Sequence, residues 1–588
     1  MQRQWRIMPH DRARVEQLIS ATRLPPVVAQ LLVSRGVYNG DDAQRFLCTK
    51  LTGLRDPQQL PGIPAATAIL IEAIQAKTPI VIYGDYDADG MTGTSILVNG
   101  IRLLGGDVSY YVPNRLEDGY GLNENAICKL AERGKKLIVS VDCGITSVRH
   151  AELCRELGVK LIVTDHHQMS DQLPDADAIV HPRLPGTSYP FGELCGAGVA
   201  FKLAWSLCQE KCGAKKVTDP MRRFLMQSLS LAAIGTVADV VPLLDENRIL
   251  VEHGIRMLRA EPMIGLVELM RRSKLDQAVS LNTESISFNI APRLNAAGRL
   301  GQAQLAVELL TTNDSERAAA LAEYIDQLNG NRDSLQRSVY LAAQKQVKTD
   351  FDAESDPALV LAGVGWHQGV IGIVAGRLAD KYGKPVFILS MDQAGKTSAV
   401  GSGRVGGTAI NLHEALGQCS DRLIRFGGHQ AAAGLTIDER QIDAFRGDFC
   451  EAVAQQAAEI NVEPEIAIDA EAALGQLTVE TIKQMEMLAP FGAGNPRPIL
   501  YCGNVRLDEP ARKMGGGDRH LSVKFRQGSK VIRGVAFGAG EWCDELNSVS
   551  GPIEIAYRPV INDFRGFQKA EVHLVDWRPA VIPEPATS

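Results

Sequence analysis

Residues 79–90 read Pro-Ile-Val-Ile-Tyr-Gly-Asp-Tyr-Asp-Ala-Asp-Gly, a short apolar run that ends in three carboxylates at alternate positions. The apolar half, residues 79–83, predicts a buried β-strand. The acidic half places Asp85, Asp87 and Asp89 at the carboxyl end of that strand. Carboxylates this close together repel one another unless a cation neutralises them. The stretch therefore predicts a strand whose end binds metal ions.

Two other interpretations of residues 84–90 are an EF-hand calcium loop and a plain acidic turn. An EF-hand requires Glu at position 96 and a helix before the loop. The chain has Ile96 there and a predicted strand before the loop, which argues against calcium binding of that kind. A turn without metal would leave crowded charges unpaired, which is costly.

Strands and helices alternate on both sides of this stretch, as hydrophobic periodicity shows. The expected strands are 108–112, 136–141 and 160–163, and the expected helices are 92–104, 123–133 and 147–157. Such alternation is typical of a mostly parallel sheet with helices on both faces.

Further Asp and His residues follow the next strands. Asp142 ends the strand at 136–141, and an Asp-His-His triplet ends the one at 160–163. Alone, such an Asp more often caps a helix. The carboxyl ends of strands in an open α/β sheet converge on one crevice, however, so these side chains are expected to meet. The residues that follow Asp142 in this group are Asp165, His166, His167 and, after a later apolar run, Asp239. Because the group contains Asp and His but no Cys, its side chains suit manganese or magnesium.

The composition sets broad limits. The chain has 588 residues, 45% hydrophobic and 22% charged, which is enough for about four globular domains. The net charge of -7 gives no sign of a nucleic-acid partner, so any basic surface must be local. Eleven cysteines without a CxxC pair, and a polar stretch at 1–10 without a signal peptide, favour reduced thiols and a cytoplasmic location. The longest apolar run, 229–244, is interrupted by Asp239 and is too short for a membrane span.

The texture of the sequence divides the chain into five expected parts. Residues 311–350 have helical periodicity and predict a long connecting helix, with two shorter helices split at Gly330 as the alternative. From residue 463 onward, short strands predict a small β-barrel of the OB-fold type. The expected parts are a helical segment at 1–55, an α/β lobe at 56–310, the connector at 311–350, a second α/β lobe at 351–462 and the barrel at 463–588.

A series of motifs carries a family resemblance. The motifs are GDYDADG at 84–90, VDCGI at 141–145, TDHH at 164–167, GTVADVVPL at 235–243, APRLNAAGR at 291–299, GSGR at 401–404 and GGH at 427–429. Together they resemble the DHH phosphoesterase superfamily and, within it, the single-strand-specific 5′→3′ exonucleases. The resemblance spans residues 55–580 in the family's order and implies a catalytic lobe, an associated lobe and an OB-fold domain.

The resemblance implies a two-metal site and the roles of its residues. Two divalent ions, Mn²⁺ or Mg²⁺, would be held by Asp87, Asp89, Asp142, His166 and Asp239, with Asp142 bridging them. His167 would face the scissile phosphate, with Asp165 in the same catalytic group. Many members have His at the position of Tyr83, so here Asp85 takes its place, directly or through water. Two cations about 4 Å apart lower the pKa of a shared water and stabilise the attacking and leaving oxygens.

Glycine-rich motifs of the second lobe suggest anion binding. Residues 401–404 and 426–429 place glycines where a backbone must approach a phosphate. Gly401, Gly403 and Gly406 also spell GxGxxG, but no acidic residue follows at the distance that dinucleotide binding requires. By resemblance, the strand's phosphates would be held by Ser402, Arg404 and His429, with Arg115, Arg293 and Arg299 as further candidates.

The barrel carries a local basic stretch. Residues 506–533 contain eight basic and three acidic side chains, which a solvated face would also explain. OB-folds bind single strands by combining a basic groove with stacking aromatic rings. Phe525, Phe537 and Tyr557 are the candidates, each of which could equally belong to the core.

The resemblance implies a 5′→3′ exonuclease for single-stranded DNA that releases 5′ mononucleotides and acts in recombination and repair, and the acidic motifs and the barrel agree with it. A phosphodiesterase for cyclic dinucleotides or short oligonucleotides, a pyrophosphatase and a non-catalytic replication scaffold are the alternatives. The barrel favours the nuclease, because those smaller-substrate relatives do not need it, and the filled ligand positions argue against the scaffold. The expected partners are single-stranded DNA with a 5′ end and, by resemblance, a single-strand-binding protein and a helicase. The chain is expected to be a monomer without a membrane association.

Overall fold

The computed structural model describes residues 4–9, 11–115, 119–352, 355–392, 398–459, 465–564 and 567–580. The chain forms two compact units. One comprises Met1–Leu54, Pro242–Leu244 and Glu463–Ser588, and the other comprises Arg55–Val241 and Asp245–Val462.

The first sheet of the larger unit contains five parallel strands in the order β3-β2-β4-β5-β6, as the alternating sequence predicts. Gly84 pairs with Val141, and Val141 with Thr164, so the three central strands end at the same level. The strands are β2 (Ile80–Gly84), β3 (Val108–Tyr111), β4 (Leu137–Val141), β5 (Lys160–Thr164) and β6 (Ala178–Val180).

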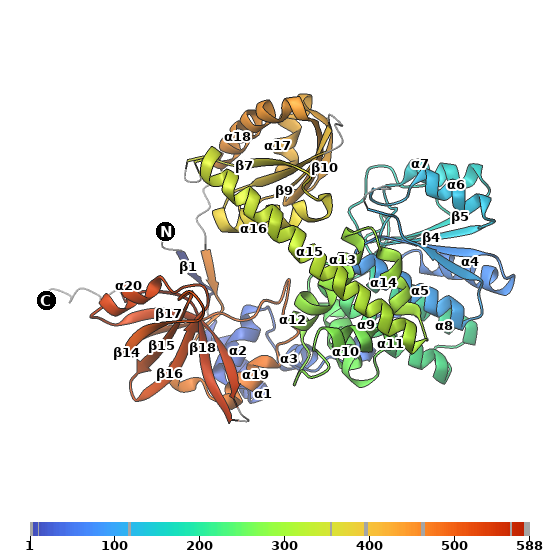
Figure 1. The fold of residues 1–588 in the computed structure, drawn as a ribbon. Helices are drawn as coiled ribbons and strands as arrows, with labels where there is room; N and C mark the ends of the chain where they lie inside the picture. The colour runs from blue at the N-terminus through green and yellow to red at the C-terminus, as the bar shows by residue number, and fades with distance from the viewer. Residues whose placement is uncertain are drawn as a thin grey trace. The chain divides into compact units, whose positions relative to one another are not determined.

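Helices cover both faces of this sheet (Figure 1). On one face, α6 (Glu124–Glu132) and α7 (Val148–Glu156) pack on a core that includes Val81 and Tyr83. On the other face lie α4 (Ile63–Gln75), α5 (Ala88–Leu103) and α8 (Gly196–Cys212). Helix α5 begins within the acidic motif, at Ala88, four residues earlier than the expected start at Thr92, because Asp87 caps it.

A helical segment follows the sheet. Its first helix, α9, ends at Ala238, so that Asp239 occupies its C-cap. A π-helical turn at Ile286–Ile290 precedes the APRLNAAGR motif, which forms α13. Every described helix is too short or too polar to cross a bilayer. The helices are α9 (Asp219–Ala238), α10 (Asp245–Ala260), α11 (Ile264–Arg272), α12 (Thr283–Ser285), α13 (Ala291–Arg299) and α14 (Ala303–Thr311).

The connector is one helix, α15 (Ser315–Asp350), of 36 residues, and not two shorter ones. Asp314 caps its start by accepting from the amides of Glu316 and Arg317. Gly330 does not interrupt it, because a single Gly weakens a helix by only about 1 kcal/mol and apolar side chains on both sides of it are buried.

The second α/β lobe contains a mixed sheet in the order β10-β11-β9-β8-β7. Only β7 and β8 are parallel. The strands are β7 (Leu359–Val364), β8 (Val386–Met391), β9 (Ser398–Arg404), β10 (Leu423–Gly428) and β11 (Ala432–Asp438), and the helices are α16 (Gln368–Tyr382), α17 (Leu412–Gln418) and α18 (Ile442–Glu459).

The smaller unit joins the two ends of the chain. The N-terminal segment is not wholly helical as expected, since β1 (Gln4–Ile7) pairs in parallel with β12 (Glu465–Ile468). Its helices share one hydrophobic core with the C-terminal barrel. Strand β12 lies far from β1 in the sequence, so no local sequence pattern predicts this pairing. The helices are α1 (Arg12–Thr22), α2 (Pro26–Ser34) and α3 (Gly40–Leu47).

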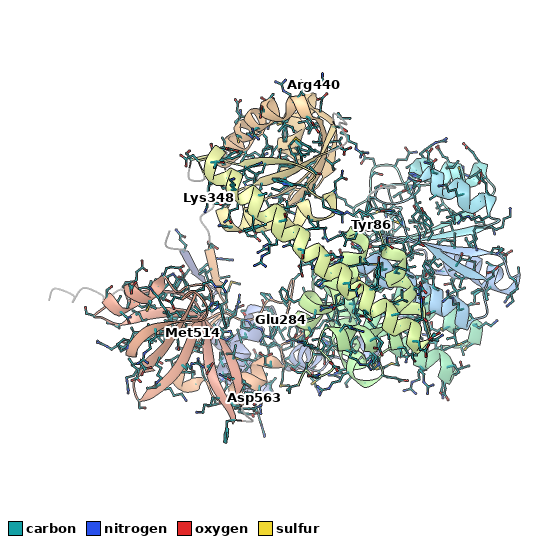
Figure 2. The ribbon with its side chains drawn as sticks, viewed as in Figure 1. Tyr86, Glu284, Lys348, Arg440, Met514 and Asp563 are labelled. Atoms are coloured by element: carbon teal, nitrogen blue, oxygen red, sulfur yellow. The ribbon has the colours of Figure 1, made fainter. Side chains whose placement is uncertain are left out.

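The C-terminal strands form the OB-fold barrel that the sequence predicts. Their order is β13-β14-β15-β16-β18-β17, and β14 also pairs with β17 to close the barrel. Strand β14 spans 15 residues and ends at Met514, labelled in Figure 2, so it is longer than expected. The elements are β13 (Ala470–Glu471), α19 (Val479–Glu486), β14 (Leu500–Met514), β15 (His520–Gln527), β16 (Lys530–Ala536), α20 (Trp542–Ser548), β17 (Ile553–Phe564) and β18 (Phe567–Pro579).

Candidate metal centre

Three neighbouring strands of the first sheet each end in an acidic residue. The amide of Asp85 bonds Val141 O after β2, and the amide of Asp142 bonds Thr164 O after β4. Asp165 follows β5 in the same way, through Val180 O. The parallel ladder therefore brings residues that are far apart in sequence to one edge of the sheet.

Their ligand atoms form overlapping groups. In each of three sets, the donor atoms lie within 4.8 Å of one another; the sets are Asp85–Asp87–Asp142, Asp89–His166–Asp239 and Asp142–His166–His167. His166 Nε2 lies 3.1 Å from Asp142 Oδ1 and 3.5 Å from Asp239 Oδ2. Asp142 thus stands between an all-carboxylate group and a group that contains His166.

The chemistry of this donor set fits divalent cations. Three buried atoms have no hydrogen-bond partner, namely Asp85 Oδ1, Asp142 Oδ1 and His166 Nε2. Burial, followed by the charges of neighbouring Asp residues, raises the pKa of Asp142 well above its ordinary value. Unpaired carboxylates in such a position require a counter-charge, and oxygen and imidazole ligands suit Mn²⁺ or Mg²⁺.

The acidic loop is held from the APRLNAAGR motif. Asp87 accepts from the amides of Asp89 and Gly90, and Asn295 Oδ1 of α13 accepts from the amide of Ala88. A Cβ at Gly298 would lie 1.9 Å from the carbonyl oxygen of Tyr86, which Figure 2 labels. No role was predicted for Asn295 or Gly298 from the sequence, although both lie in the motif at 291–299.

The amino end of α8 binds Asp89. The amides of Gly196 and Ala197 donate to its two carboxylate oxygens at 2.7 and 2.9 Å. Helix amino ends attract negative charge, so this contact fixes the carboxylate without a basic side chain. A Cβ at Gly196 would lie 2.6 Å from Asp142, and one at Gly235 would lie 2.3 Å from Asp89 Oδ1. This support was not predicted from the sequence.

Two non-glycine residues at the site have a left-handed backbone conformation. Asp142 has a φ of 63°, and Val240, next to Asp239, has a φ of 61°. A β-branched residue such as Val rarely adopts positive φ. Each such residue costs about 1–3 kcal/mol, which the surrounding structure must offset.

His167 and Asp165 form a pair beside the carboxylates. His167 Nδ1 lies 2.7 Å from Asp165 Oδ1, and Asp165 also accepts from the amides of His166, His167 and Ile145. Burial opposes ionisation of both groups, but their mutual hydrogen bond and charges outweigh it, so the pKa of Asp165 falls to about 2 and that of His167 rises to about 9. Asp165 was grouped with the catalytic residues; its contacts are those of a residue that orients His167.

Arginines from distant segments gather near the acidic loop. Burial first, and then the charges of Arg115, Arg332 and Arg404, lower the pKa of Arg299 to about 10. Arg404 donates to Ser402 Oγ, and Arg115 lies over the ring of Tyr86. Arg332 Nε is buried without a partner. Clustered guanidinium groups with an unused donor favour an anion between them. Arg332 was missed because it lies in the connector.

Two expected phosphate ligands have other contacts. Arg293 donates from Nε to Asp326 Oδ1 and from Nη1 to Asn289 O. His429 is exposed, and its amide bonds Ala432 O. Their roles in substrate binding stay predictions.

The raised carboxylate pKa values predict how pH affects metal binding. Burial, then the charges of Asp89 and Asp87, raise the pKa of Asp239 to about 8. A raised folded pKa stabilises the metal-free fold fully below the unfolded value, and this contribution is lost as pH rises through the folded value. Between about pH 4 and 8 the metal-free site therefore becomes less stable, and Mn²⁺ displaces fewer protons. We expect the Mn²⁺-induced rise in Tm to be larger at pH 8.5 than at pH 6.0.

Differential scanning fluorimetry with and without EDTA measures this difference. Asp239→Asn, which removes the titrating carboxylate, should reduce the dependence on pH. An Mn²⁺ effect that is equal at both pH values would contradict the interpretation.

Three family models match the chain. The DHH family N-terminal domain matches residues 79–236, the DHHA1 domain matches 355–455 and the RecJ OB domain matches 468–576. The first match contains β2, β4 and β5 with their terminal acidic residues, and the second contains Ser402 and Arg404.

Similar proteins cover nearly all of the chain. A single-stranded-DNA-specific exonuclease RecJ from Bacillus subtilis (strain 168) is 39% identical over 97% of this chain and 70% of its own length. The RecJ of Escherichia coli (strain K12) is 34% identical over 93% of this chain and 95% of its own. The crystal structure of RecJ in complex with Mn²⁺ from Thermus thermophilus aligns with a TM-score of 0.81 at 32% identity, covering 98% of this chain and 80% of that one.

Proposed function

The chain belongs to the RecJ family of single-stranded-DNA-specific exonucleases, and from this premise we propose how its own residues bind and cut the strand. It is a metal-dependent phosphoesterase of the DHH type. The observation that carries the proposal is the set of buried acidic and histidine atoms without partners at the ends of β2, β4 and β5. We propose that the enzyme hydrolyses single-stranded DNA in the 5′→3′ direction and releases 5′ mononucleotides.

Two divalent cations, Mn²⁺ or Mg²⁺, would occupy this site. Asp85 and Asp87 would hold one, Asp89, His166 and Asp239 the other, and Asp142 would bridge them. When bound, the cations supply a water of lowered pKa and stabilise charge on the attacking and leaving oxygens. The amides of α8 and the capped acidic loop orient the carboxylates in advance, which reduces the reorganisation that metal binding requires.

His167 would act on the substrate phosphate. In the metal-free protein, the hydrogen bond and charge of Asp165 outweigh burial and raise the pKa of His167 to about 9, which favours the imidazolium form. Asp165 holds Nδ1, and Nε2, which lies 3.4 Å from the Tyr120 hydroxyl, would donate to a phosphate oxygen. Charge-assisted donors of this kind stabilise negative charge that grows in the transition state.

The arginine cluster would bind the terminal 5′ phosphate. After burial, the charges of Arg115, Arg332 and Arg404 lower the pKa of Arg299, and a dianionic phosphate would relieve that repulsion. A mid-strand phosphodiester carries less charge, so a cluster of this kind favours a strand terminus. Recognition of the 5′ end would set the direction of hydrolysis. Arg115, Ser402 and, by resemblance, Arg293 and His429 would complete the phosphate contacts.

The alternative functions are not favoured. The relatives that cover nearly the whole chain are single-stranded-DNA-specific exonucleases, and the chain carries the RecJ OB domain as well. A non-catalytic scaffold would not need a complete set of metal ligands. By resemblance, we also propose a monomeric enzyme of the cytoplasm that acts in recombination and repair beside a single-strand-binding protein and a helicase. The five expected parts of the chain remain our proposed domain division.

A substrate series tests the proposed polarity. With Mn²⁺, we expect release of mononucleotides from the 5′ end of a 3′-labelled 30-mer, much slower cleavage of blunt duplex, and no cleavage of a cyclic dinucleotide. Arg404→Gln should raise KM for the 5′-phosphorylated strand by about 10- to 100-fold, since a charge-assisted contact contributes about 1.5–3 kcal/mol. It should change KM for a 5′-hydroxyl strand far less. Release of label from the 3′ end first would overturn the polarity.

A further inference from the structure

Half of the eight basic residues in the basic stretch of the barrel form ion pairs with acidic partners, namely Lys513, Lys524, Arg526 and Arg533. Lys524 lies 3.2 Å from Glu509, and Arg533 lies 3.0 Å from Glu571. Arg526 pairs with Asp508. Surface ion pairs of this kind leave little net field for a phosphate backbone. The outer face of β15 and β16 is therefore less suited to hold a strand by charge than its composition suggests.

The three aromatic candidates of the barrel differ sharply in exposure. Phe525 and Tyr557 are fully buried, and the Tyr557 hydroxyl bonds Ala472 O inside the barrel. These two rings are core residues. Phe537 is 62% exposed, although it directly follows β16 in an ordered part of the barrel. A large apolar ring left open to solvent has a cost in free energy that binding would remove.

Two histidine rings hold Phe537 in place. Its ring centroid lies 5.0 Å from that of His573 and 5.6 Å from that of His520, with interplanar angles of 89° and 73°. His520 is fixed in turn, because Gly538 donates its amide to His520 Nδ1 at 2.9 Å. Perpendicular contacts of this kind orient a ring and leave a face of it accessible. We call these three residues the aromatic triad.

The triad is built from three strands of the barrel. His520 begins β15, Phe537 follows β16, and His573 lies on β18. On β17, Arg558 pairs with His573 in the ladder, so both side chains leave the sheet on the same face. Arg558 is exposed, and among the described residues it forms no ion pair. An unpaired cation thus accompanies the exposed ring.

We propose that the aromatic triad is a nucleobase-stacking site, in which Phe537 stacks on one base of the single strand and Arg558 contacts an adjacent phosphate. This inference rests on the proposed function and adds a binding site for the same substrate on the smaller unit. Because every base has a π-face, stacking on Phe537 accepts any sequence, as an exonuclease requires. Because two histidines already orient the Phe537 ring, stacking on it costs little side-chain entropy.

The test measures equilibrium binding of the full-length protein to a 3′-labelled (dT)30 strand in EDTA, where no hydrolysis occurs. Phe537→Ala should weaken binding by about tenfold, since stacking contributes about 1–3 kcal/mol per base. Phe537→Trp should retain binding and Phe537→Leu should not, because Leu keeps the apolar volume but has no π-face. Phe567→Ala is the matched control, since Phe567 is 75% exposed on the same barrel; it should bind as the wild type does.

Salt titration separates the two parts of the site. Loss of a stacking contact lowers affinity equally at all salt concentrations, whereas Arg558→Gln should reduce the slope of log K against log salt by about one. The inference is overturned if Phe537→Ala or Phe537→Leu binds as the wild type does, an outcome that would assign the triad to a protein contact. If the wild type itself fails to bind and degrade single strands, the proposed function fails instead. Unchanged Tm values establish that each variant is folded.

Discussion

Asp142→Asn should yield a folded protein that binds metal poorly and hydrolyses single-stranded DNA at least about 1,000-fold more slowly, a loss of about 4 kcal/mol in transition-state stabilisation. Asp142 is the one carboxylate that belongs both to the group of Asp85 and Asp87 and to a group with His166. Asn has nearly the same shape but cannot supply the negative charge that two neighbouring cations share. The substitution therefore affects both metal positions at once.

The same substitution should stabilise the metal-free protein. The pKa of Asp142 is raised by burial and by Asp89, Asp87 and Asp85, so its ionised form opposes folding at neutral pH. A neutral amide removes this repulsion, and each 1 kcal/mol gained should raise Tm by about 2–4 °C. Calorimetry in EDTA measures the shift, and isothermal titration with Mn²⁺ measures the lost affinity.

Asp175→Asn provides the control for Asp142→Asn. Asp175 forms an exposed ion pair with Arg155, apart from the metal ligands. It should leave hydrolysis, Mn²⁺ affinity and Tm essentially unchanged. Retained hydrolysis in Asp142→Asn, or a lower metal-free Tm, would mean that Asp142 does not hold the position described here.

The convergence of the acidic residues at one edge of the sheet could be predicted from sequence, because it follows a rule of the fold. Parallel strands end at one edge of their sheet, so an Asp after each apolar run is enough to place Asp85, Asp142 and Asp165 together. The alternation of strands and helices likewise predicts the α/β class, and the run of short strands predicts the barrel. None of these steps requires knowledge of which distant segments touch.

The contacts that support the acidic residues could not be predicted, because they join segments that are far apart in the sequence. The amide of Gly196 reaches Asp89 across 107 positions, and Asn295 reaches Ala88 across 207. Arg332 joins the arginines from the middle of a helix whose sequence indicates only a connector. The charge of the basic stretch of the barrel could not be judged from sequence for the same reason. The sequence does not show which acidic residues the sheet register places beside Lys524 and Arg533.

Gly196 lies at one of these long-range contacts. Gly196 opens α8, where an Ala would be favoured by about 1 kcal/mol for helix formation alone. A side chain at this position would clash with Asp142, because a Cβ there would lie 2.6 Å from both Cβ and Oδ1 of that residue. Two residues along the same helix, a Cβ at Gly198 would have its nearest neighbour, Leu194 Cδ2, at 3.4 Å. The two positions therefore differ in their distance from the carboxylates and little in secondary structure.

Gly196→Ala should accordingly lower Mn²⁺ affinity by at least about tenfold and hydrolysis by about 100-fold, the range found when contacts that orient metal ligands are removed. The added methyl must displace either Asp142 or the amino end of α8, and the second movement also breaks the amide contacts to Asp89. Gly198→Ala should retain both properties, because Leu194 can yield by a small side-chain shift. Electron paramagnetic resonance of free Mn²⁺ and circular dichroism measure metal affinity and helix content on the same samples. If the two variants have equal Mn²⁺ affinities, α8 does not position the carboxylates. If only Gly196→Ala loses Mn²⁺ affinity and its helix content is unchanged, α8 does position them.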